Sequence, residues 1–379
     1  MSSHRTWIEI DERALAGNIR ALRGLLPEGV RFCAVVKANA YGHGQKEIVQ
    51  IAARQDVDAF AVDTLEDALA IRADLPSALV LVLGYVLHER LPEAIRERIH
   101  LTVYDRETVR AAEAAAAGMA RTADVHVKIE TGTRRQGVNP EDVDDLLGAV
   151  RHAPHVRLAG VSTHFADIDR ADDTSYATLQ LERFDAAVAR VREAGFRPDW
   201  VHGACSAGII LYPATYGTLV RAGIGLYGLW PSPDVHLASV QHMVKCDLNP
   251  VLAWKTRIAQ VKAVPAGESV GYGRSEFTRR PTRLAVLPVG YWDGYDRGGS
   301  GVGEVLVGGA RCRVMGRVCM NMMMADVSAV PNVAPEQEVV LLGSAGRHRV
   351  TAEDMAKWAG TINYEVVTRI NPLLPRVVV

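Results

Sequence analysis

The sequence predicts an α/β protein in which a (β/α)8 TIM-type barrel is followed by a second, mostly β domain. Eight short apolar runs alternate with helical patterns over residues 32–224, and after the Pro-rich stretch 230–233 the chain changes to short β-like runs with frequent glycine. At 379 residues, the chain also exceeds the size at which one hydrophobic core stops growing. We therefore predict a barrel over residues 11–238 and a mostly β domain over residues 239–379, completed by a strand within residues 1–10.

The barrel elements are predicted in chain order. Residues 6–10 predict a short strand and residues 14–25 an amphipathic helix. The first barrel strand is the apolar run 32–36, whose lack of alternating polar residues is typical of a parallel strand covered on both faces. The other barrel strands are predicted at residues 59–62, 78–83, 99–103, 125–129, 158–162, 200–204 and 219–224. Helices are predicted at residues 45–55, 64–73, 106–118, 141–150 and 175–194.

The second domain is predicted from short runs with β propensity and almost no helix between them. These runs cover residues 251–264, 283–289, 304–307, 313–318, 323–327 and 338–342. A late helix is expected over residues 351–359, because Thr351 can cap its start and the acidic pair Glu353-Asp354 suits the positive end of a helix.

Composition and charge favour a small-molecule partner. The 43 basic and 44 acidic residues leave a formal net charge of -1, which gives no overall attraction to nucleic acid or to an anionic membrane. No apolar run approaches the length of a membrane span, and the N-terminus lacks the pattern of a secretory signal, so we expect a cytoplasmic protein. The five cysteines contain no C-x-x-C pair, which argues against a disulfide framework and a zinc site. We expect reduced cysteines and no metal.

Lys37 ends the first barrel strand, at the edge where parallel sheets place their chemistry. An amine in apolar surroundings loses proton affinity from a pKa of about 10.4 and becomes a nucleophile for aldehydes. The alternative is a strand-end lysine that extends its charged head into water. The next residues favour a ligand site, since Gly42 and Gly44 permit a close backbone approach and Tyr41 offers a hydroxyl.

Chemically reactive side chains gather at the same predicted edge of the barrel. The residues at or just beyond the strand ends are Lys37, Lys128, Glu130, Arg134, Arg135, His164, Ser206, Arg221 and Gly223. Each alone has an ordinary structural explanation, such as a hydrogen-bonded histidine or a helix-capping serine. Their coincidence at one face favours an active site. Ser206 and residues 222–224 follow strands seven and eight, where such barrels often bind phosphate.

One motif points elsewhere and is set aside. Residues 223–228 fit G-x-G-x-x-G, the fingerprint of dinucleotide binding. That fingerprint requires a glycine turn that opens a helix within a βαβ unit, whereas here the run leads to Trp230-Pro231. A nicotinamide site is therefore disfavoured.

The segment AVVKANAYGHG, from Ala34 to Gly44, resembles the cofactor-lysine segment of bacterial alanine racemases. The resemblance covers nearly the whole chain, to the final LLPRVV. It implies an enzyme that carries pyridoxal 5'-phosphate on Lys37 and interconverts L- and D-alanine through an external aldimine, supplying D-alanine for peptidoglycan. It also implies a homodimer whose active sites are shared between subunits.

The resemblance assigns roles to the residues at the barrel edge. Cofactor phosphate would be held by positions that match Tyr41, Ser206, Gly223, Ile224 and Tyr364. Arg221 matches an arginine directed at the pyridine nitrogen, and His164 a histidine against the cofactor ring, expected to be neutral. Because a guanidinium is a poor proton source, the pyridine stays unprotonated and is a weaker electron sink, which suits a racemase.

Further roles are implied for substrate and catalysis. Tyr272, which on sequence alone reads as a surface tyrosine, matches the catalytic tyrosine that enters from the partner subunit, so that Lys37 and Tyr272 are the two bases. Substrate contacts match Arg135, Met320 and Tyr291, with Arg134 as a competitor for the role of Arg135. Lys128 matches a supporting lysine that is often carbamylated in the family.

Alternatives remain for substrate and reaction. Asn321, Trp292 and Thr133-Arg134 depart from the family pattern and leave open a serine racemase or one of broader specificity. A barrel-type pyridoxal phosphate amino-acid decarboxylase is a second alternative, which Arg221 opposes because decarboxylases favour a strong pyridinium electron sink. A cofactor carrier without catalysis is a third, opposed by the large second domain.

Overall fold

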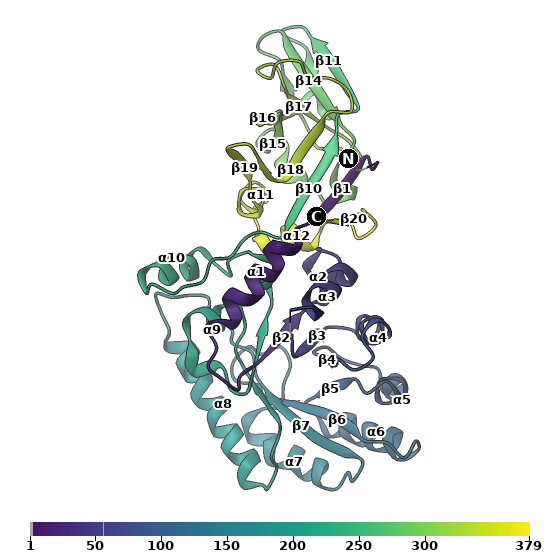
Figure 1. Ribbon diagram of the computed structural model, residues 1–379, viewed down its shortest axis with the longest axis vertical. Helices are drawn as coiled ribbons and strands as arrows, with labels where there is room; N and C mark the ends of the chain where they lie inside the picture. Colours follow the sequence, from purple (N-terminus) through teal and green to yellow (C-terminus); the bar gives the residue numbers. More distant parts are fainter. Residues whose placement is uncertain (1–2, 56) are drawn as a thin grey trace. The chain divides into compact units, whose positions relative to one another are not determined.

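The computed structural model describes residues 3–55 and 57–379, which fold into two compact units (Figure 1). One unit contains Leu15–Ala38 and Ile48–Asn249, and the other contains Met1–Ala14, Asn39–Glu47 and Pro250–Val379. The segment Asn39–Glu47 thus packs with the C-terminal part of the chain, a placement that the sequence pattern did not indicate. The ranges 11–238 and 239–379 with residues 1–10 remain our proposal for the domains, with residues 1 and 2 outside the described part.

Eight parallel strands form the barrel of the first unit, and this confirms the predicted fold class. Their order is β8-β7-β6-β5-β4-β3-β2-β9. The strands are β2 (Arg31–Val35), β3 (Ala59–Val62), β4 (Leu79–Val82), β5 (His100–Val103), β6 (Ala123–Lys128), β7 (Val156–Ser162), β8 (Trp200–His202) and β9 (Leu219–Ala222). Thr218 N donates to Val201 O at 2.8 Å and Arg221 N to Ala204 O at 3.0 Å, which joins the β8 and β9 ends of the sheet.

Helices follow most of these strands, and side-chain caps explain several of their starts. Thr64, Asp105 and Ser232 each accept a hydrogen bond from a backbone N–H in the first turn. The helices are α1 (Glu12–Arg23), α2 (Lys37–Tyr41), α3 (Gln45–Ala53), α4 (Leu65–Asp74), α5 (Leu91–Arg96), α6 (Arg106–Ala117), α7 (Val143–Arg151), α8 (Ser175–Glu193), α9 (Ser206–Leu211) and α10 (Pro233–Gln241). Helices α2, α5 and α10 were not predicted, and α10 begins within the Pro-rich stretch, where proline suits the first helical position.

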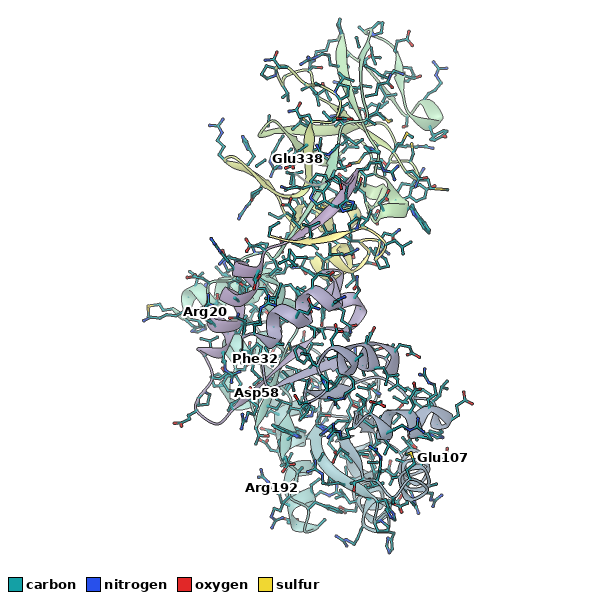
Figure 2. All side chains as sticks on the ribbon, turned by 45° about the vertical axis from the view of Figure 1, so that its right-hand side comes forward. Arg20, Phe32, Asp58, Glu107, Arg192 and Glu338 are labelled. Carbon is teal, nitrogen blue, oxygen red and sulfur yellow. The ribbon has the colours of Figure 1, made fainter. Side chains whose placement is uncertain are left out.

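A partly buried carboxylate fixes the start of the lysine-bearing strand. Phe32 and Asp58 lie next to each other in the barrel unit (Figure 2), and Phe32 N donates to Asp58 Oδ2 at 2.8 Å. Arg23 and Arg31 pair with the same carboxylate at 3.0 and 2.9 Å. Burial raises the pKa of Asp58, but these hydrogen bonds outweigh it and lower the pKa below its ordinary value. Asp58 therefore stays charged and anchors β2 at the end opposite to Lys37.

The second unit is built on a mostly antiparallel sheet of order β11-β14-β17-β16-β15-β18-β10-β1-β20. The strands are β1 (Thr6–Ile10), β10 (Leu252–Arg257), β11 (Gln260–Val264), β14 (Thr282–Leu287), β15 (Glu304–Val307), β16 (Ala310–Met315), β17 (Met323–Asp326), β18 (Glu338–Ala345), β19 (His348–Val350), which pairs with β18, and β20 (Arg376–Val378). Strand β1 joins this sheet between β10 and β20. Trp7, Trp254 and Tyr295 are its largest fully buried side chains.

Some elements of the second unit differ from the expectation. The single run predicted over residues 251–264 is two strands, β10 and β11. Strands β12 (Ser269–Val270) and β13 (Glu276–Phe277) are too short to show a period of two in the sequence. Thr351 caps the start of helix α11 (Ala352–Ala359) as predicted, whereas α12 (Asn363–Thr368) was not predicted. Within residues 3–55 and 57–379, no helix combines the length and the apolar character needed to cross a bilayer.

Candidate active site

Lys37 lies directly beyond the carboxyl end of β2 and begins the short helix α2. Its side chain is partly buried, and burial lowers its pKa below the ordinary value. The nearby cations Arg135 and Arg221 lower the pKa further, while Asp63 opposes them. A lowered pKa increases the neutral fraction of the amine, which is the nucleophilic form.

The residues after Lys37 form a left-handed turn. Ala38, Asn39, Ala40 and Tyr41 have φ angles of 53°, 54°, 52° and 53°, although none of them is glycine. Each such residue costs about 1–2 kcal/mol relative to a right-handed conformation. Asn39 helps to hold the turn, since its Oδ1 accepts from Gln45 N at 2.9 Å and its carbonyl accepts from Gly44 N at 3.0 Å.

The end of the chain holds this turn within the second unit. Arg376 donates from NH2 to Gly42 O at 2.7 Å. A Cβ on Gly42 would lie 1.9 Å from Val367 O, so only glycine fits this position. The rings of Tyr41 and Tyr364, two predicted phosphate ligands, have centroids 6.2 Å apart. The second unit therefore brings these two hydroxyl-bearing residues together.

In the barrel unit, Ser206 binds the segment after β9. Its Oγ accepts from Gly223 N at 3.0 Å and from Gly225 N at 3.1 Å, at the start of the 3₁₀ helix Ile224–Tyr227. Ser206 itself is the first residue of α9. The structure thus joins Ser206, Gly223 and Ile224, the barrel residues predicted to bind phosphate, into one cluster of hydroxyl and backbone N–H groups.

Arg221 points its guanidinium at polar groups inside the barrel. It donates to His202 O at 2.9 Å, to Thr163 O at 2.9 Å, to Gly203 O at 3.2 Å and to His202 Nδ1. Burial lowers the pKa of His164 to about 3, and Arg221 and Arg135 lower it as well. The His164 imidazole is therefore neutral at pH 7, as we expected.

Four cations influence one another at the carboxyl end of the barrel. Burial lowers the pKa of Lys128 to about 8, together with the charges of Arg221, Arg135 and Lys37. Lys128 Nζ donates to Gln136 Oε1 at 3.0 Å. A concentration of positive charge is unfavourable alone and favours an anionic ligand. With the Ser206 cluster and the nucleophilic Lys37, these residues fit a phosphate-bearing aldehyde cofactor.

Glu130 organises the loop that carries Arg135. Its carboxylate accepts from Gly132 N at 2.5 Å and from Arg135 N at 3.3 Å, and a Cβ on Gly137 would lie 2.7 Å from Glu130 N. Burial raises the pKa of Glu130, but the backbone hydrogen bonds outweigh it and lower the pKa below 4.5. The loop conformation therefore depends on a charged Glu130.

We expect Glu130→Gln to lower the free energy of unfolding by about 1–3 kcal/mol at pH 7. The glutamine side chain has one oxygen and one NH2 group, so it can accept only one of the two backbone hydrogen bonds. A lowered folded-state pKa stabilises the protein above the ordinary pKa and ceases to do so as pH falls through the folded value. Urea unfolding should therefore show the gap between variant and wild type closing at acidic pH. Glu141→Gln, at an exposed site, is the control. A gap that stays constant with pH would contradict the role of the charge.

The second unit carries the remaining predicted residues around one hollow of about 1120 Å³. Tyr272, Tyr291 and Met320 all line it, with Asn321 beside them. Tyr272 lies between Gly271 and Gly273, which have φ angles of 75° and 71°, and is 73% exposed in the chain alone. This hollow therefore presents an accessible phenol together with the predicted substrate contacts.

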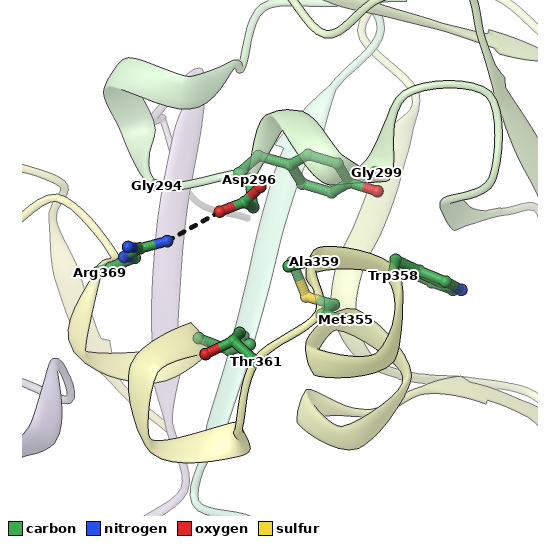
Figure 3. Close-up of a pocket in the computed structure, with 10 residues that line it drawn as sticks. Gly294, Asp296, Gly299, Met355, Trp358, Ala359, Thr361 and Arg369 are labelled. Atoms are coloured by element: carbon green, nitrogen blue, oxygen red, sulfur yellow. Dashed lines mark hydrogen bonds and ion pairs between the residues drawn. The ribbon is translucent and has the colours of Figure 1, made fainter.

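A small pocket in the second unit lies outside this group of residues. The pocket is closed by the pair Arg369–Asp296 at 2.9 Å and is lined by Tyr295, Met355 and neighbouring residues (Figure 3). Its lining contains no lysine, histidine or cysteine. Among the described residues, no group of three or more His, Cys, Asp or Glu side chains is arranged to hold a metal ion. The described cysteines are all free.

Two family models match this chain and together cover almost all of it. The model of the alanine racemase N-terminal domain matches residues 10–231, and that of the C-terminal domain matches residues 251–378. The chain belongs to the alanine racemase family. It is an amino-acid racemase, an isomerase that interconverts L- and D-alanine.

Individual relatives agree with this assignment. The chain is 40% identical to the alanine racemase of Desulfosudis oleivorans, with 100% of this chain and 97% of the relative covered. The crystal structure of alanine racemase from D-cycloserine producing Streptomyces lavendulae matches with a TM-score of 0.93 and 36% identity, covering 100% and 98% of the two chains. Histidine racemase from Leuconostoc mesenteroides matches with a TM-score of 0.88 and 26% identity over 100% and 99%. The fold of an alanine racemase therefore does not by itself select alanine.

Proposed function

We propose that this alanine racemase binds pyridoxal 5'-phosphate on Lys37 and uses Lys37 and Tyr272 as bases on opposite faces of the substrate. The partly buried Lys37, with its lowered pKa at the end of β2, carries the proposal. Pyridoxal phosphate, when bound, withdraws electrons from Cα and makes the α-proton acidic. Lys37 then takes or returns this proton on the D-alanine side, and Tyr272 does so on the L-alanine side.

The other residues bind and orient. The phosphate is held by Tyr41, Ser206, Gly223, Ile224 and Tyr364, supported by the Ser206 hydrogen bonds and the Tyr41–Tyr364 contact. Arg221 faces the pyridine nitrogen and the neutral His164 lies against the ring. For the substrate, Arg135 and the Met320 backbone N–H bind the carboxylate, and Tyr291 lies at the mouth of the site.

We also propose a homodimer in which Tyr272 acts in the active site of the partner subunit. The exposed position of Tyr272 supports this arrangement, because a catalytic phenol must be covered when it works. The proposed location is the cytoplasm, where D-alanine is used to make peptidoglycan precursors.

The function is tested by incubating the purified enzyme with single amino acids and added cofactor, followed by chiral chromatography. We expect either enantiomer of alanine to reach an equal mixture faster than serine or larger amino acids. Faster conversion of serine would indicate that Asn321 and Trp292, on the surface of the second unit, have changed the specificity. Release of carbon dioxide without inversion would instead indicate a decarboxylase.

Lys128 is proposed to react with carbon dioxide to form a carbamate that faces Arg135. The N–C bond forms from the neutral amine with loss of one proton, and a pKa of about 8 leaves half of the amine neutral at pH 8. The product is an anion among cations, so a charge-assisted pair replaces a repulsion. Gln136 accommodates either form, because its amide can turn to accept or to donate.

The carbamate should appear as a ¹³C signal after addition of labelled bicarbonate, and it should grow as pH rises from 7 to 9. Lys128→Arg should lack the signal. Lys255→Arg is the matched control, because Lys255 pairs with Glu9 at 2.8 Å and Glu338 at 3.0 Å and has a raised pKa. A signal that persists in Lys128→Arg would contradict the assignment.

A further inference from the structure

Three histidines link Arg221 to the opposite end of the barrel. Arg221 NH1 donates to His202 Nδ1, and His202 Nε2 lies 2.8 Å from His126 Nδ1. His126 Nε2 lies 3.0 Å from His100 Nδ1. All four residues are at most 9% exposed. Each imidazole thus contacts one neighbour through Nδ1 and another through Nε2, and together they form a continuous buried chain.

The chain of histidines runs along the barrel from one end to the other. His100 is the first residue of β5, His126 lies within β6, and His202 is the last residue of β8. At the amino end, His100 Nε2 lies 3.7 Å from Asp124 Oδ2. At the carboxyl end of the barrel, the histidine chain ends at Arg221, in the proposed active site. The histidines therefore connect the active site with a carboxylate on the far rim.

A glycine makes room for this arrangement. Strand β7 lies between β6 and β8, and its Gly160 pairs with His126. A Cβ on Gly160 would lie 2.2 Å from His126 Nδ1, in the space that the ring uses to reach His202. The φ angle of Gly160 is not in the left-handed region, so its backbone does not require glycine. The residue is needed for the space that it leaves.

Arg221 and Asp124, at the two ends of the histidine chain, determine which ring nitrogens carry protons. A guanidinium can only donate, and a carboxylate can only accept. Between such ends, neutral imidazoles complete every hydrogen bond in one arrangement alone, with each Nδ1 bare and each Nε2 protonated. A second proton on any one of these rings would place a proton on its Nδ1. The hydrogen bonds between that ring and Arg221 would then have to reverse their direction, and two donors would face each other at His202 Nδ1 and Arg221.

The surroundings keep the histidines neutral. Burial lowers the pKa of His126 and His202 well below the ordinary value, and burial also lowers that of His100. The charged and titratable groups that face the three rings are Arg221, Lys128, Asp124, Arg157, Arg72, Asp199 and the histidines themselves. Asp124 in turn accepts from Arg157 Nε at 2.5 Å.

We propose that His126 and His100 are positioning residues for Arg221, and that through His202 they hold its guanidinium in one orientation as a pure donor. The proposal rests on the proposed function in that Arg221 faces the cofactor ring. Neither histidine touches substrate or cofactor. Their effect is on the electron demand of the ring, because a guanidinium that turns or shares a proton changes its hydrogen bond to the pyridine nitrogen.

The proton arrangement can be measured directly. In holoenzyme labelled with ¹⁵N-histidine, NMR at pH 7 should show the three Nδ1 atoms bare and the three Nε2 atoms protonated. This result does not depend on turnover, so it separates the histidine chain from the proposed function, whose failure would appear as a lack of racemisation in the wild type. A protonated Nδ1 on His202, or a doubly protonated ring in the chain, would overturn the proposal.

Two substitutions of His126 separate its two contacts. The amide of asparagine replaces Nδ1 and can still accept from His202, whereas the amide of glutamine replaces Nε2 and reaches only His100. For His126→Gln we expect kcat to fall roughly 10-fold with a smaller change in KM, and the absorption band of the bound cofactor to shift. His126→Asn should lie between this variant and the wild type.

A control variant removes a hydrogen bond elsewhere in the barrel unit. Ser239→Ala removes a hydrogen bond of 2.7 Å to the backbone oxygen of His236 from a buried residue of α10 outside the histidine chain, and should leave kcat and the cofactor band unchanged. Equal kcat and equal spectra for His126→Gln and the wild type would overturn the positioning role. If the His126 variants do not fold, the wild-type NMR spectrum still decides whether the histidine chain exists.

Discussion

Lys37→Ala should abolish racemisation, with a loss of at least about 10⁴-fold, because it removes the covalent attachment of the cofactor and one of the two bases. Borohydride reduction of the wild-type holoenzyme should fix the cofactor on Lys37, as peptide mapping would show. The physical reason is that burial gives Lys37 a lowered pKa at the end of β2. Lys255→Ala, which removes a lysine with two carboxylate partners in the second unit, is the control and should retain the adduct.

An adduct on Lys128 would sink this assignment. Lys128 is the serious competitor, because it is also partly buried and has a pKa of about 8. A variant Lys128→Ala that keeps the adduct, beside a Lys37→Ala variant that loses it, would exclude this competitor. Circular dichroism of both variants would show that the loss is chemical and not a failure to fold.

Tyr272→Phe should lower racemisation in both directions by about 10²- to 10⁴-fold, equivalent to roughly 3–5 kcal/mol of barrier. The side chain is 73% exposed in the chain alone, so the change should cost little stability. Exchange of the α-proton in deuterated water should persist mainly for D-alanine, whose proton Lys37 removes. Tyr85→Phe, at another exposed tyrosine, is the control.

Near wild-type racemisation by Tyr272→Phe would show that another residue acts on the L face. Equal loss of exchange from both enantiomers, with cofactor still bound, would also contradict the two-base assignment. Mixing Tyr272→Phe with Lys37→Ala subunits tests whether the site is shared. If Tyr272 serves the partner, random heterodimers contain one intact site each, and about a quarter of wild-type activity should return.

The barrel strands were predictable because burial on both faces leaves a distinctive apolar run. The strand predicted at residues 59–62 has the same bounds in the structure, and the others differ by one or two residues at an end. Strands β12 and β13 were missed because two residues carry no pattern. The left-handed turn was missed for another reason, since Ala38, Ala40 and Tyr41 have no local preference for positive φ and Asn39 alone does not indicate a turn of four such residues.

The predicted barrel-edge residues were recognisable from their places at strand ends, yet the histidines behind Arg221 were overlooked. A signal was present, because His126 and His202 interrupt apolar runs in which any polar side chain must find a partner. Sequence alone does not show which partner each one finds. No sequence pattern indicated the role of Gly160, because that role depends on the His126 ring of the neighbouring strand.

The strained turn after Lys37 also constrains when the enzyme becomes functional during its synthesis. Four residues in this conformation cost roughly 4–8 kcal/mol, so the turn has no tendency to form on a nascent chain. Its restraint comes from Arg376, which is 334 residues further along than Gly42. Since domains fold in order as they emerge from the ribosome, Lys37 is made early but its loop is ordered last. A chain that stops short of Arg376 would contain every barrel strand and still lack an ordered cofactor loop.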